Sequence, residues 1–295
     1  MSHPVSRRHF IGAAATTLAM GYVAPLSALA LSEKDLSALC SRLEQRLQGR
    51  LGVALIDTAT GTGQQYRGNE RFPLCSTFKL LACAAILSRV DAKQENLERL
   101  IAIRPGQIVN YSPVTQEHVG ASMPLGDICH AALTQSDNTA GNLLLEALGG
   151  PTAITTFART LNDEVTRLDR WETALNEAIP GDPRDTTTPQ AMASDVHRVL
   201  DQHLSIRARQ QLSDWLVHSQ TGFSRLRAGL PSHWQVGDKT GMGQQGSTCD
   251  LAVIWPPGKA PIIAAVYMAE TPASVDERNR AFADIGRFIA ENGVR

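Results

Sequence analysis

LCSTFKLLACAAIL, residues 74–87, is an apolar run in which Lys79 is the only charged side chain. Its pattern predicts a helix over residues 76–90. Because residues i and i+3 lie on the same helix face, Ser76 and Lys79 are expected to meet. An apolar environment disfavours the charged form of a lysine, so Lys79 can take the serine proton, while the helix N-terminus supplies N–H donors for an oxyanion. The Ser-x-x-Lys spacing occurs by chance in many proteins, so it indicates a nucleophile only with further support.

Two further triplets follow along the chain, SDN at residues 136–138 and KTG at residues 239–241. Singly, the first is typical of a turn or a helix N-cap, and the second of a strand end. In this order and at these separations, Ser-x-x-Lys, SDN and KTG are the signature of class A β-lactamases and penicillin-binding proteins. The chain resembles a class A serine β-lactamase over essentially its whole length after residue 30, as far as DERN at residues 276–279.

The rest of the chain has strand patterns towards both ends and helical patterns in the middle. A helix is predicted at residues 32–47, and a two-strand hairpin follows it at 51–57 and 64–68. Helical patterns dominate from residue 74 to about 216. Further strands are predicted at 234–239, 250–255 and 261–268, before a closing amphipathic helix at 275–292. An α/β lobe built from both chain ends and interrupted by an all-α lobe explains this order.

The resemblance implies the same architecture, the two-lobed β-lactamase and penicillin-binding-protein-like fold, which is α/β plus all-α. An antiparallel sheet of about five strands is flanked by the N- and C-terminal helices and carries an inserted helical lobe. We assign residues 31–74 and 218–295 to the α/β lobe and residues 75–217 to the all-α lobe. The resemblance places the active site in the cleft between the lobes.

The first thirty residues differ from the rest of the chain. Arg7-Arg8 precedes a weakly apolar run, no acidic residue occurs before Glu33, and Ala28-Leu29-Ala30 has the small-x-small form of a cleavage site. This is typical of a twin-arginine-like export signal over residues 1–30, cleaved near Ala30, with a frayed N-terminal helix as the alternative. We therefore expect a periplasmic or secreted protein.

Charge and length exclude several other classes of protein. The chain has 28 Lys and Arg against 29 Asp and Glu, and loss of the leader removes two of the basic residues. No basic stripe is present, and no later segment has the 18 or so unbroken apolar residues of a membrane span. We expect no nucleic-acid partner and no stable membrane insertion, and a monomer that binds small β-lactam substrates and inhibitors.

A segment from Arg170 to Asp185 resembles the Ω-loop of the family, which we place at about residues 167–185. A loop of this length fits a compact fold only when its own side chains hold it together. The resemblance implies that Arg170 and Asp185 form the closing ion pair. It also implies that Glu172 and Asn176 hold the water that hydrolyses the acyl-enzyme, with Glu172 as general base. Without the resemblance, Glu172 could be an ordinary exposed loop acid.

Further roles follow from the resemblance. The backbone N–H groups of Ser76 and Met242 form the oxyanion hole, and Ser136 passes a proton to the departing lactam nitrogen. Whether Lys79 or Glu172 is the base for acylation stays open. The residues expected to bind the substrate are Tyr111 as an apolar wall, Asn138 and Asn176, and Lys239, Thr240 and Gly241 on the facing edge strand.

The chain departs from the commonest family pattern at the position that binds the substrate carboxylate. Many relatives have an arginine on the edge strand where this chain has Thr248. Arg225 lies where other members supply the guanidinium from the opposite side. We therefore expect Arg225 to bind the carboxylate and Arg227 to be structural.

The cysteines follow the family pattern in part. By resemblance, Cys83 and Cys129 are expected to form a structural disulfide. Cys75 is expected to be a buried free thiol, because its usual partner position is occupied by Gly243. The odd number of cysteines, five, leaves at least one thiol free, and their spacing matches no zinc motif. No metal and no other cofactor is expected.

The resulting prediction is an enzyme that hydrolyses penicillin- and cephalosporin-type antibiotics through an acyl-enzyme on Ser76, and so confers β-lactam resistance. A D,D-peptidase of the penicillin-binding-protein class is the nearest alternative, and Glu172 with Asn176 argues against it. A non-catalytic β-lactam sensor domain is the second alternative. A serine amidohydrolase such as a glutaminase ranks third, because it lacks the loop that carries Glu172.

Overall fold

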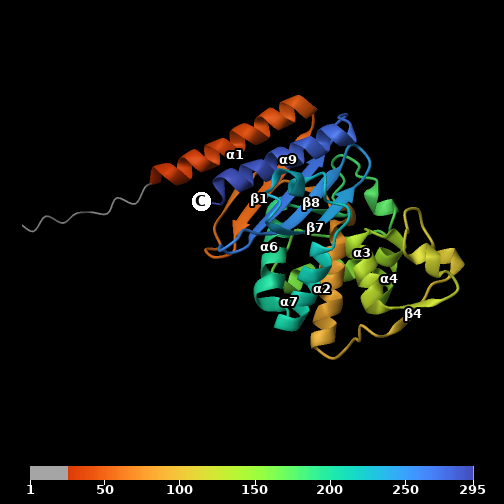
Figure 1. Ribbon diagram of the computed structural model, residues 1–295. Coiled ribbons are helices and arrows are strands. Elements are labelled where there is room, and N and C mark those ends of the chain that lie inside the picture. Colours follow the sequence, from red (N-terminus) through yellow and green to blue (C-terminus); the bar gives the residue numbers. More distant parts are fainter. Residues whose placement is uncertain (1–25, 295) are drawn as a thin grey trace, which may run out of the picture.

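The computed structural model describes residues 26–294, with side chains from residue 36, and its centre is a five-stranded antiparallel sheet (Figure 1). The strand order is β2-β1-β9-β8-β7, so β1 from near the N-terminus pairs with β9 from near the C-terminus. The strands are β1 (Arg50–Asp57), β2 (Gly63–Tyr66), β7 (Gln235–Met242), β8 (Thr248–Trp255) and β9 (Ile262–Ala269). This arrangement leaves β7 at one edge of the sheet.

Both faces of the sheet are covered. On β1, Val53 and Leu55 belong to one buried apolar cluster, whereas Ala54 and Ile56 belong to another, as the alternation of side chains along a strand requires. The first cluster lies beneath α1 (Leu26–Leu47), α8 (Leu226–Gly229) and α9 (Val275–Asn292). Figure 1 shows α1 and α9 side by side over this face. A capping box between Ser274 and Glu277 fixes the start of α9.

The second cluster lies between the sheet and the helices of the middle of the chain. Its centre is α2 (Phe78–Asp91), in which every residue from Phe78 to Leu87 is buried. A helix that is apolar all round must be enclosed by neighbours on every side. The helices that pack against it are α3 (Leu125–Thr134), α4 (Asn138–Leu148), α5 (Thr152–Thr160) and α7 (Ile206–Val217), whereas α6 (Pro189–Arg198) packs on β1 and β9.

Short elements complete the described chain. The helix predicted at 76–90 begins as a 3-10 turn, η1 (Cys75–Thr77), and α6 continues into the π-helical turn η5 (Val199–His203). Two small strand pairs were not predicted, β3 (Phe72–Pro73) with β6 (Thr186–Thr187) and β4 (Leu100–Ala102) with β5 (Ser122–Pro124). Three more 3-10 turns are η2 (Pro105–Gln107), η3 (Thr115–His118) and η4 (Ala174–Asn176).

The predicted fold class is confirmed, with a five-stranded antiparallel sheet, terminal helices on one face and a helical insertion. None of the helices within residues 26–294 has the length and apolar character that crossing a membrane demands. The leader predicted at residues 1–30 lies outside the described residues as far as residue 25, and residues 26–30 begin α1.

The predicted disulfide between Cys83 and Cys129 is not present, because all five cysteines are free thiols. The two residues are buried neighbours, and the Cys83 Sγ lies 3.7 Å from the carbonyl oxygen of Cys129. Burial, and then the hydrogen bond with Cys129, raise the pKa of the Cys83 thiol. Since the thiolate is the form that attacks in disulfide formation, this environment keeps Cys83 in the unreactive form. Cys75 is a buried free thiol, as predicted.

A pair of buried carboxyl groups makes stability depend on pH. Asp195 on α6 is fully buried, and burial together with the neighbouring Asp163 raises its pKa to about 9. Asp163 has a lowered pKa and accepts the N–H groups of Val165 and Thr166. The folded protein therefore keeps Asp195 protonated between pH 4 and 9, whereas the unfolded chain ionises it. Folding takes up a proton in this window, so stability falls as pH rises through it.

Asp195→Asn removes this dependence, because asparagine is neutral at every pH. The free energy of unfolding of the variant, relative to the wild type, is expected to rise by about 3 kcal/mol between pH 6 and pH 8. Urea unfolding of both proteins at the two pH values measures this difference, and any fixed effect of the amide cancels. If the variant and the wild type differ in free energy of unfolding by the same amount at pH 6 and pH 8, Asp195 is ionised in the folded protein.

Candidate active site

Ser76 lies in the 3-10 turn that precedes α2. Cys75 before it has φ +44°, a left-handed conformation that is sparsely populated by residues other than glycine. Thr77 fixes the turn by donating its hydroxyl to the Leu74 carbonyl at 2.6 Å. Ser76 is 7% exposed, and its Oγ donates to the Glu172 Oε1 at 3.2 Å. The turn therefore presents the hydroxyl to a carboxylate.

Lys79 follows one turn later, and its Nζ lies 3.0 Å from the Ser76 Oγ, as predicted. The side chain is fully buried, but the expected apolar environment of the amine is wrong. Nζ also lies 2.9 Å from the Ser136 carbonyl, 2.7 Å from the Asn138 Oδ1 and 3.0 Å from the Glu172 Oε1. Only the stem is enclosed by carbon, and a Cβ at Gly141 would lie 2.7 Å from its Cε. The amine is held among oxygens that come from three separate segments.

The SDN triplet forms the loop between α3 and α4. Ser136 has φ +59°, and Asp137 caps α4 by accepting the Ala140 N–H at 2.8 Å. Asp137 also accepts the N–H and hydroxyl of Thr115, so it ties this loop to the preceding one. Asn138 then faces Lys79, and the Ser136 Oγ accepts a hydrogen bond from the Lys239 Nζ at 2.9 Å. The triplet thus connects the two lysines of the site.

The KTG triplet lies on the edge strand β7. Lys239 is fully buried, and desolvation, followed by the nearby ammonium of Lys79, lowers its pKa to about 7. The hydroxyl of Thr240 lies 2.6 Å from that of Thr221, a residue to which the sequence analysis gave no role. A Cβ at Gly241 would lie 3.0 Å from the Ser76 backbone nitrogen. Glycine at this position therefore leaves room beside the Ser76 N–H.

The second predicted oxyanion donor is on the same strand. Gly243 donates its N–H to the Ser247 carbonyl, on the side of β7 that faces β8. Because successive N–H groups of a strand point to opposite sides, the N–H of Met242 points away from β8. β7 is an edge strand, so no other strand of residues 26–294 occupies that side.

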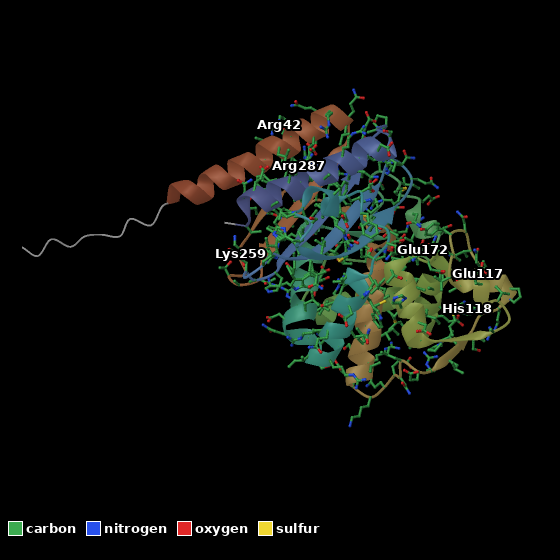
Figure 2. All side chains as sticks on the ribbon, in the orientation of Figure 1. Arg42, Glu117, His118, Glu172, Lys259 and Arg287 are labelled. Atoms are coloured by element: carbon green, nitrogen blue, oxygen red, sulfur yellow. The ribbon has the colours of Figure 1, made fainter. Side chains whose placement is uncertain are left out.

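Glu172 lies where the helical region meets the sheet (Figure 2) and is 4% exposed. One carboxylate oxygen contacts Ser76 and Lys79, and the other accepts the Asn176 Nδ2 at 2.6 Å. The backbone of Glu172 is held by Asn142, which accepts its N–H at 2.8 Å and donates to its carbonyl at 3.0 Å. Asn142 was not predicted as a site residue. Its position four residues after Asn138 in α4 puts both side chains on the same helix face, and this spacing could have indicated it. The peptide bond after Glu172 is cis.

The Ω-loop is closed by the predicted pair. Arg170 Nε lies 2.5 Å from Asp185 Oδ2, and Asp185 is 1% exposed. The other oxygen of Asp185 accepts the N–H groups of Asp169 and Arg170 at 2.7 and 2.9 Å. A second carboxylate, that of Glu177, lies 2.5 Å from Arg170 Nη1. The loop is thereby fixed two residues from Glu172.

Arg225 is 5% exposed and lies against β7 and β8. Its Nη1 donates to the Gly241 carbonyl at 3.0 Å and the Cys249 carbonyl at 2.6 Å. Arg227 instead pairs with the buried Asp238 at 3.0 Å. The guanidinium of Arg225 thus reaches the backbone of the KTG triplet but contacts neither Lys239 nor Thr240 directly.

The predicted Tyr111, and Thr248 at the position where the chain departs from the family pattern, make other hydrogen bonds. Tyr111 is 54% exposed with φ +61°, and its carbonyl accepts the Asn138 N–H at 2.9 Å. Thr248, at the position where many relatives have arginine, accepts a hydrogen bond from Arg278 Nη1 at 2.6 Å. The structure therefore joins seven predicted residues in one hydrogen-bonded network: Ser76, Lys79, Ser136, Asn138, Glu172, Asn176 and Lys239.

Comparison with known proteins gives a consistent result. The profile of the Beta-lactamase enzyme family matches residues 32–292. An ancestral class A β-lactamase is 58% identical, with 87% of this chain and 99% of that one covered and a TM-score of 0.85. The class A enzyme of the last common ancestor of Gram-negative bacteria is 56% identical, with 87% and 98% covered and a TM-score of 0.86. The putative class A β-lactamase PenP from Rhodopseudomonas palustris is 50% identical, with 87% and 99% covered and a TM-score of 0.85. This chain therefore belongs to the class A β-lactamases, the serine hydrolases that open β-lactam rings.

Proposed function

We propose that Ser76 is the nucleophile of this β-lactamase and that Glu172 is the base that releases the product. The observation that carries the proposal is the position of the Glu172 carboxylate, 3.2 Å from the Ser76 Oγ and 3.0 Å from the Lys79 Nζ. A carboxylate next to the nucleophile is what hydrolysis of an ester on that nucleophile requires. A penicillin-binding protein needs only the serine and the lysine.

Acylation begins with loss of the Ser76 proton as the Oγ attacks the lactam carbonyl. The hydroxyl donates to Glu172 and accepts from Lys79, so the bond directions favour Glu172 as the proton acceptor in the free enzyme. Lys79 is close enough to serve when Glu172 is absent. The oxyanion forms beside the N–H groups of Ser76 and Met242, which compensate its charge. The C–N bond then breaks, and Ser136 gives its proton to the lactam nitrogen while Lys239 donates to the Ser136 Oγ. The proton that Glu172 took from Ser76 passes by way of Lys79, which contacts both Glu172 and Ser136, back to Ser136, so Glu172 is again a carboxylate before deacylation.

Deacylation uses the same carboxylate in a second role. Glu172 and Asn176 bind a water that faces the ester carbonyl, and Glu172 takes its proton as the new C–O bond forms. Breakage of the ester returns the oxygen of Ser76 as a hydroxyl. Asn142 and Asn176 fix both ends of Glu172, its backbone and its carboxylate, so little reorientation precedes this step.

Substrate binding rests on the carboxylate that penicillins and cephalosporins carry. Lys239 has no ion-pair partner among the side chains of residues 36–294, and the Thr240 hydroxyl lies on the same edge strand. A carboxylate beside Lys239 favours its charged form, which desolvation by burial otherwise disfavours. Arg225 adds positive charge behind Gly241. Asn138 serves the substrate amide, and the exposed ring of Tyr111 forms an apolar wall.

The test combines turnover with intact mass. Purified protein is mixed with a chromogenic cephalosporin, and absorbance and mass are followed together. We expect rapid multiple turnover and an acyl adduct present only during turnover, which peptide mapping places on Ser76. One equivalent of a lasting adduct without turnover would indicate a D,D-peptidase or a sensor, and an adduct on another residue would overturn the assignment of the nucleophile.

Arg225→Ala tests the carboxylate assignment. Loss of the guanidinium removes attraction for the substrate carboxylate, so kcat/KM for benzylpenicillin is expected to fall about 10-fold, or 1.4 kcal/mol. The methyl ester of the same penicillin carries no such charge, so its kcat/KM should change little. A loss confined to the acid reports the attraction between Arg225 and the substrate carboxylate. A loss shared by the ester reports the hydrogen bonds by which Arg225 supports β7. If acid and ester lose activity equally, Arg225 only supports the strand.

We also propose that the protein works outside the cytoplasm, in the periplasm or as a secreted enzyme, and as a monomer. The support is the Arg-Arg pair, the apolar run and the Ala28-Leu29-Ala30 site of the first thirty residues. N-terminal sequencing of the exported protein should find a start close to Leu31.

A further inference from the structure

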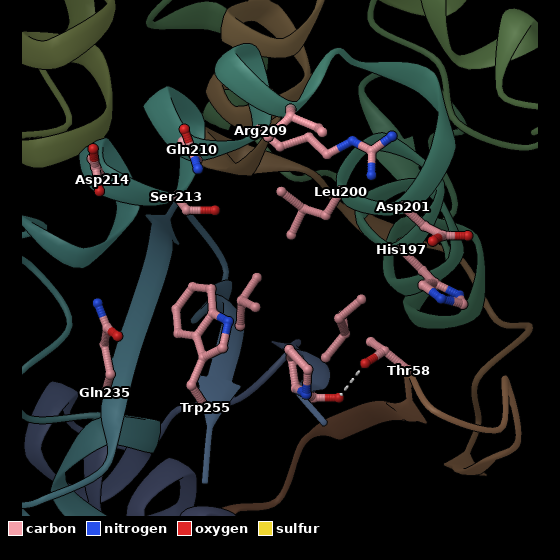
Figure 3. Close-up of a pocket in the computed structure, with 14 residues that line it drawn as sticks. Thr58, His197, Leu200, Asp201, Arg209, Gln210, Ser213, Asp214, Gln235 and Trp255 are labelled. Carbon is pink, nitrogen blue, oxygen red and sulfur yellow. Dashed lines mark hydrogen bonds between the residues drawn. The ribbon is translucent and has the colours of Figure 1, made fainter. Parts of the chain in front are cut away.

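A cavity of about 510 Å³ lies at the end of the sheet where Gln235 begins β7 (Figure 3). Gln235 begins β7 and lines the cavity, whereas Lys239 lies further along the same strand. The end of β8, at Trp255, and the start of β9, at Ile263, form its floor. None of the residues of the proposed catalytic network lines it, so this cavity is separate from the β-lactam site.

The inner surface of the cavity is apolar on two opposite walls. Val253, Trp255 and Ile263 come from the sheet, and Leu200 and Ile206 come from η5 and α7. Ile206 is 73% exposed, the highest exposure among the large apolar residues of the described side chains, and Trp255 is only partly buried. A single exposed aliphatic side chain is ordinary, but one that lines the same cavity as a partly exposed indole is typical of a ligand site.

One cation projects over this apolar surface. Arg209 follows Ile206 by three residues in α7, so both lie on the same helix face. Its Nε donates to the Leu204 carbonyl at 2.6 Å, which fixes the guanidinium on the wall above Leu200 (Figure 3). No carboxylate among the side chains of residues 36–294 forms an ion pair with it. The terminal nitrogens of Arg209 are therefore free to bind an anion, and a guanidinium matches a carboxylate in bidentate geometry.

The rim limits the charge of that anion. Asp201 and Asp214 lie on opposite sides of the opening and do not pair with Arg209 (Figure 3). One negative charge on the ligand is compensated by Arg209, whereas a second would lie near these two carboxylates and be repelled. The volume equals that of about 17 waters at about 30 Å³ each, which accommodates two fused rings.

We propose that this cavity is a binding site for a flat aromatic monocarboxylate, with its rings between Trp255 and the aliphatic wall and its carboxylate on Arg209. The proposal does not depend on the catalytic roles given above. It requires only the apolar walls, the unpaired guanidinium and the acidic rim.

The probe is 2-naphthoate, titrated into the protein by isothermal titration calorimetry. We expect one site, and Arg209→Gln should weaken binding at least 10-fold. Arg207→Gln is the matched control, because Arg207 is exposed on the same helix and does not line the cavity; it should leave the affinity unchanged. The neutral analogue 2-naphthamide should bind the wild type and Arg209→Gln equally. Ile206→Asp, at a largely exposed position, should also weaken 2-naphthoate by adding charge to the apolar wall.

The β-lactam site also attracts carboxylates, so it must be excluded as the site measured. The titration is repeated on Glu172→Ala acylated with benzylpenicillin, with mass used to verify the adduct, and 2-naphthoate should bind as before. Loss of binding after acylation would place the ligand in the catalytic site. Absence of binding, or equal losses in Arg209→Gln and Arg207→Gln, would overturn the proposal.

Discussion

Glu172→Ala is expected to stop the enzyme after acylation. With benzylpenicillin the variant should form one equivalent of covalent adduct and hydrolyse it about 10³-fold more slowly than the wild type, because removal of a general base costs this order of rate. Acylation continues because Lys79 remains 3.0 Å from the Ser76 Oγ. Glu172 is the only carboxylate among residues 36–294 that pairs with Lys79. Its loss leaves the Lys79 amine without a carboxylate partner, while the amine stays within hydrogen-bond distance of the Ser76 Oγ and can accept the serine proton.

Intact mass and quenched-flow kinetics measure the two steps separately. Glu164→Ala is the matched control, since Glu164 is 81% exposed and lies before the Ω-loop, and it should keep wild-type turnover. Glu172→Gln tests whether hydrogen bonding alone suffices, and it should also accumulate adduct. Turnover that survives in both Glu172 variants would show that another group activates the water.

The second large effect is expected from Asp185→Ala. Asp185 is buried and compensates the charge of Arg170 while accepting two backbone N–H groups. Its removal leaves both N–H donors without their acceptor and leaves the Arg170 guanidinium with only the more exposed Glu177, and breaking a buried ion pair in this way costs about 3–5 kcal/mol. The free energy of unfolding should fall by this amount. Because the loop sets the position of Glu172, deacylation should also slow more than acylation.

Urea unfolding gives the stability, and the steady-state level of adduct shows which step has slowed. Asp182→Ala is the control within the same loop, because Asp182 pairs with Arg184 at the surface, and it should change both quantities little. If stability falls but the steady-state level of acyl-enzyme is unchanged, deacylation has not slowed relative to acylation. The ion pair would then stabilise the fold without positioning Glu172.

Local geometry explains which parts of the site were predictable from sequence. The contact between Ser76 and Lys79 follows from helix periodicity, since three residues separate them. The strand that carries KTG was predicted from its pattern, although β7 extends beyond residue 239 to Met242. Helix starts were less accurate, because η1 precedes α2 and no local pattern distinguishes a 3-10 turn from a first α-helical turn.

Contacts between distant segments were predictable only through the family resemblance or not at all. Asn142 and Glu172 are 30 residues apart, and no periodicity relates them. The oxygens around Lys79 come from loops whose positions depend on the whole fold, so the local sequence suggested an apolar environment instead. The disulfide was carried over from positions alone, and position does not fix the redox state of two buried thiols.

The pairing of β1 with β9 has a consequence for how the chain reaches its native state. Val53 pairs with Val266, so the partner of an early strand is among the last segments to be synthesised. Until then β1 has only the short β2 beside it, and its other edge is open to pairing with foreign strands. Contacts of such sequence separation slow folding, because a long loop must close before they form. The sheet that supports the proposed catalytic network is thus completed late. Until β9 has been made, the free edge of β1 must be kept from pairing with strands of other chains.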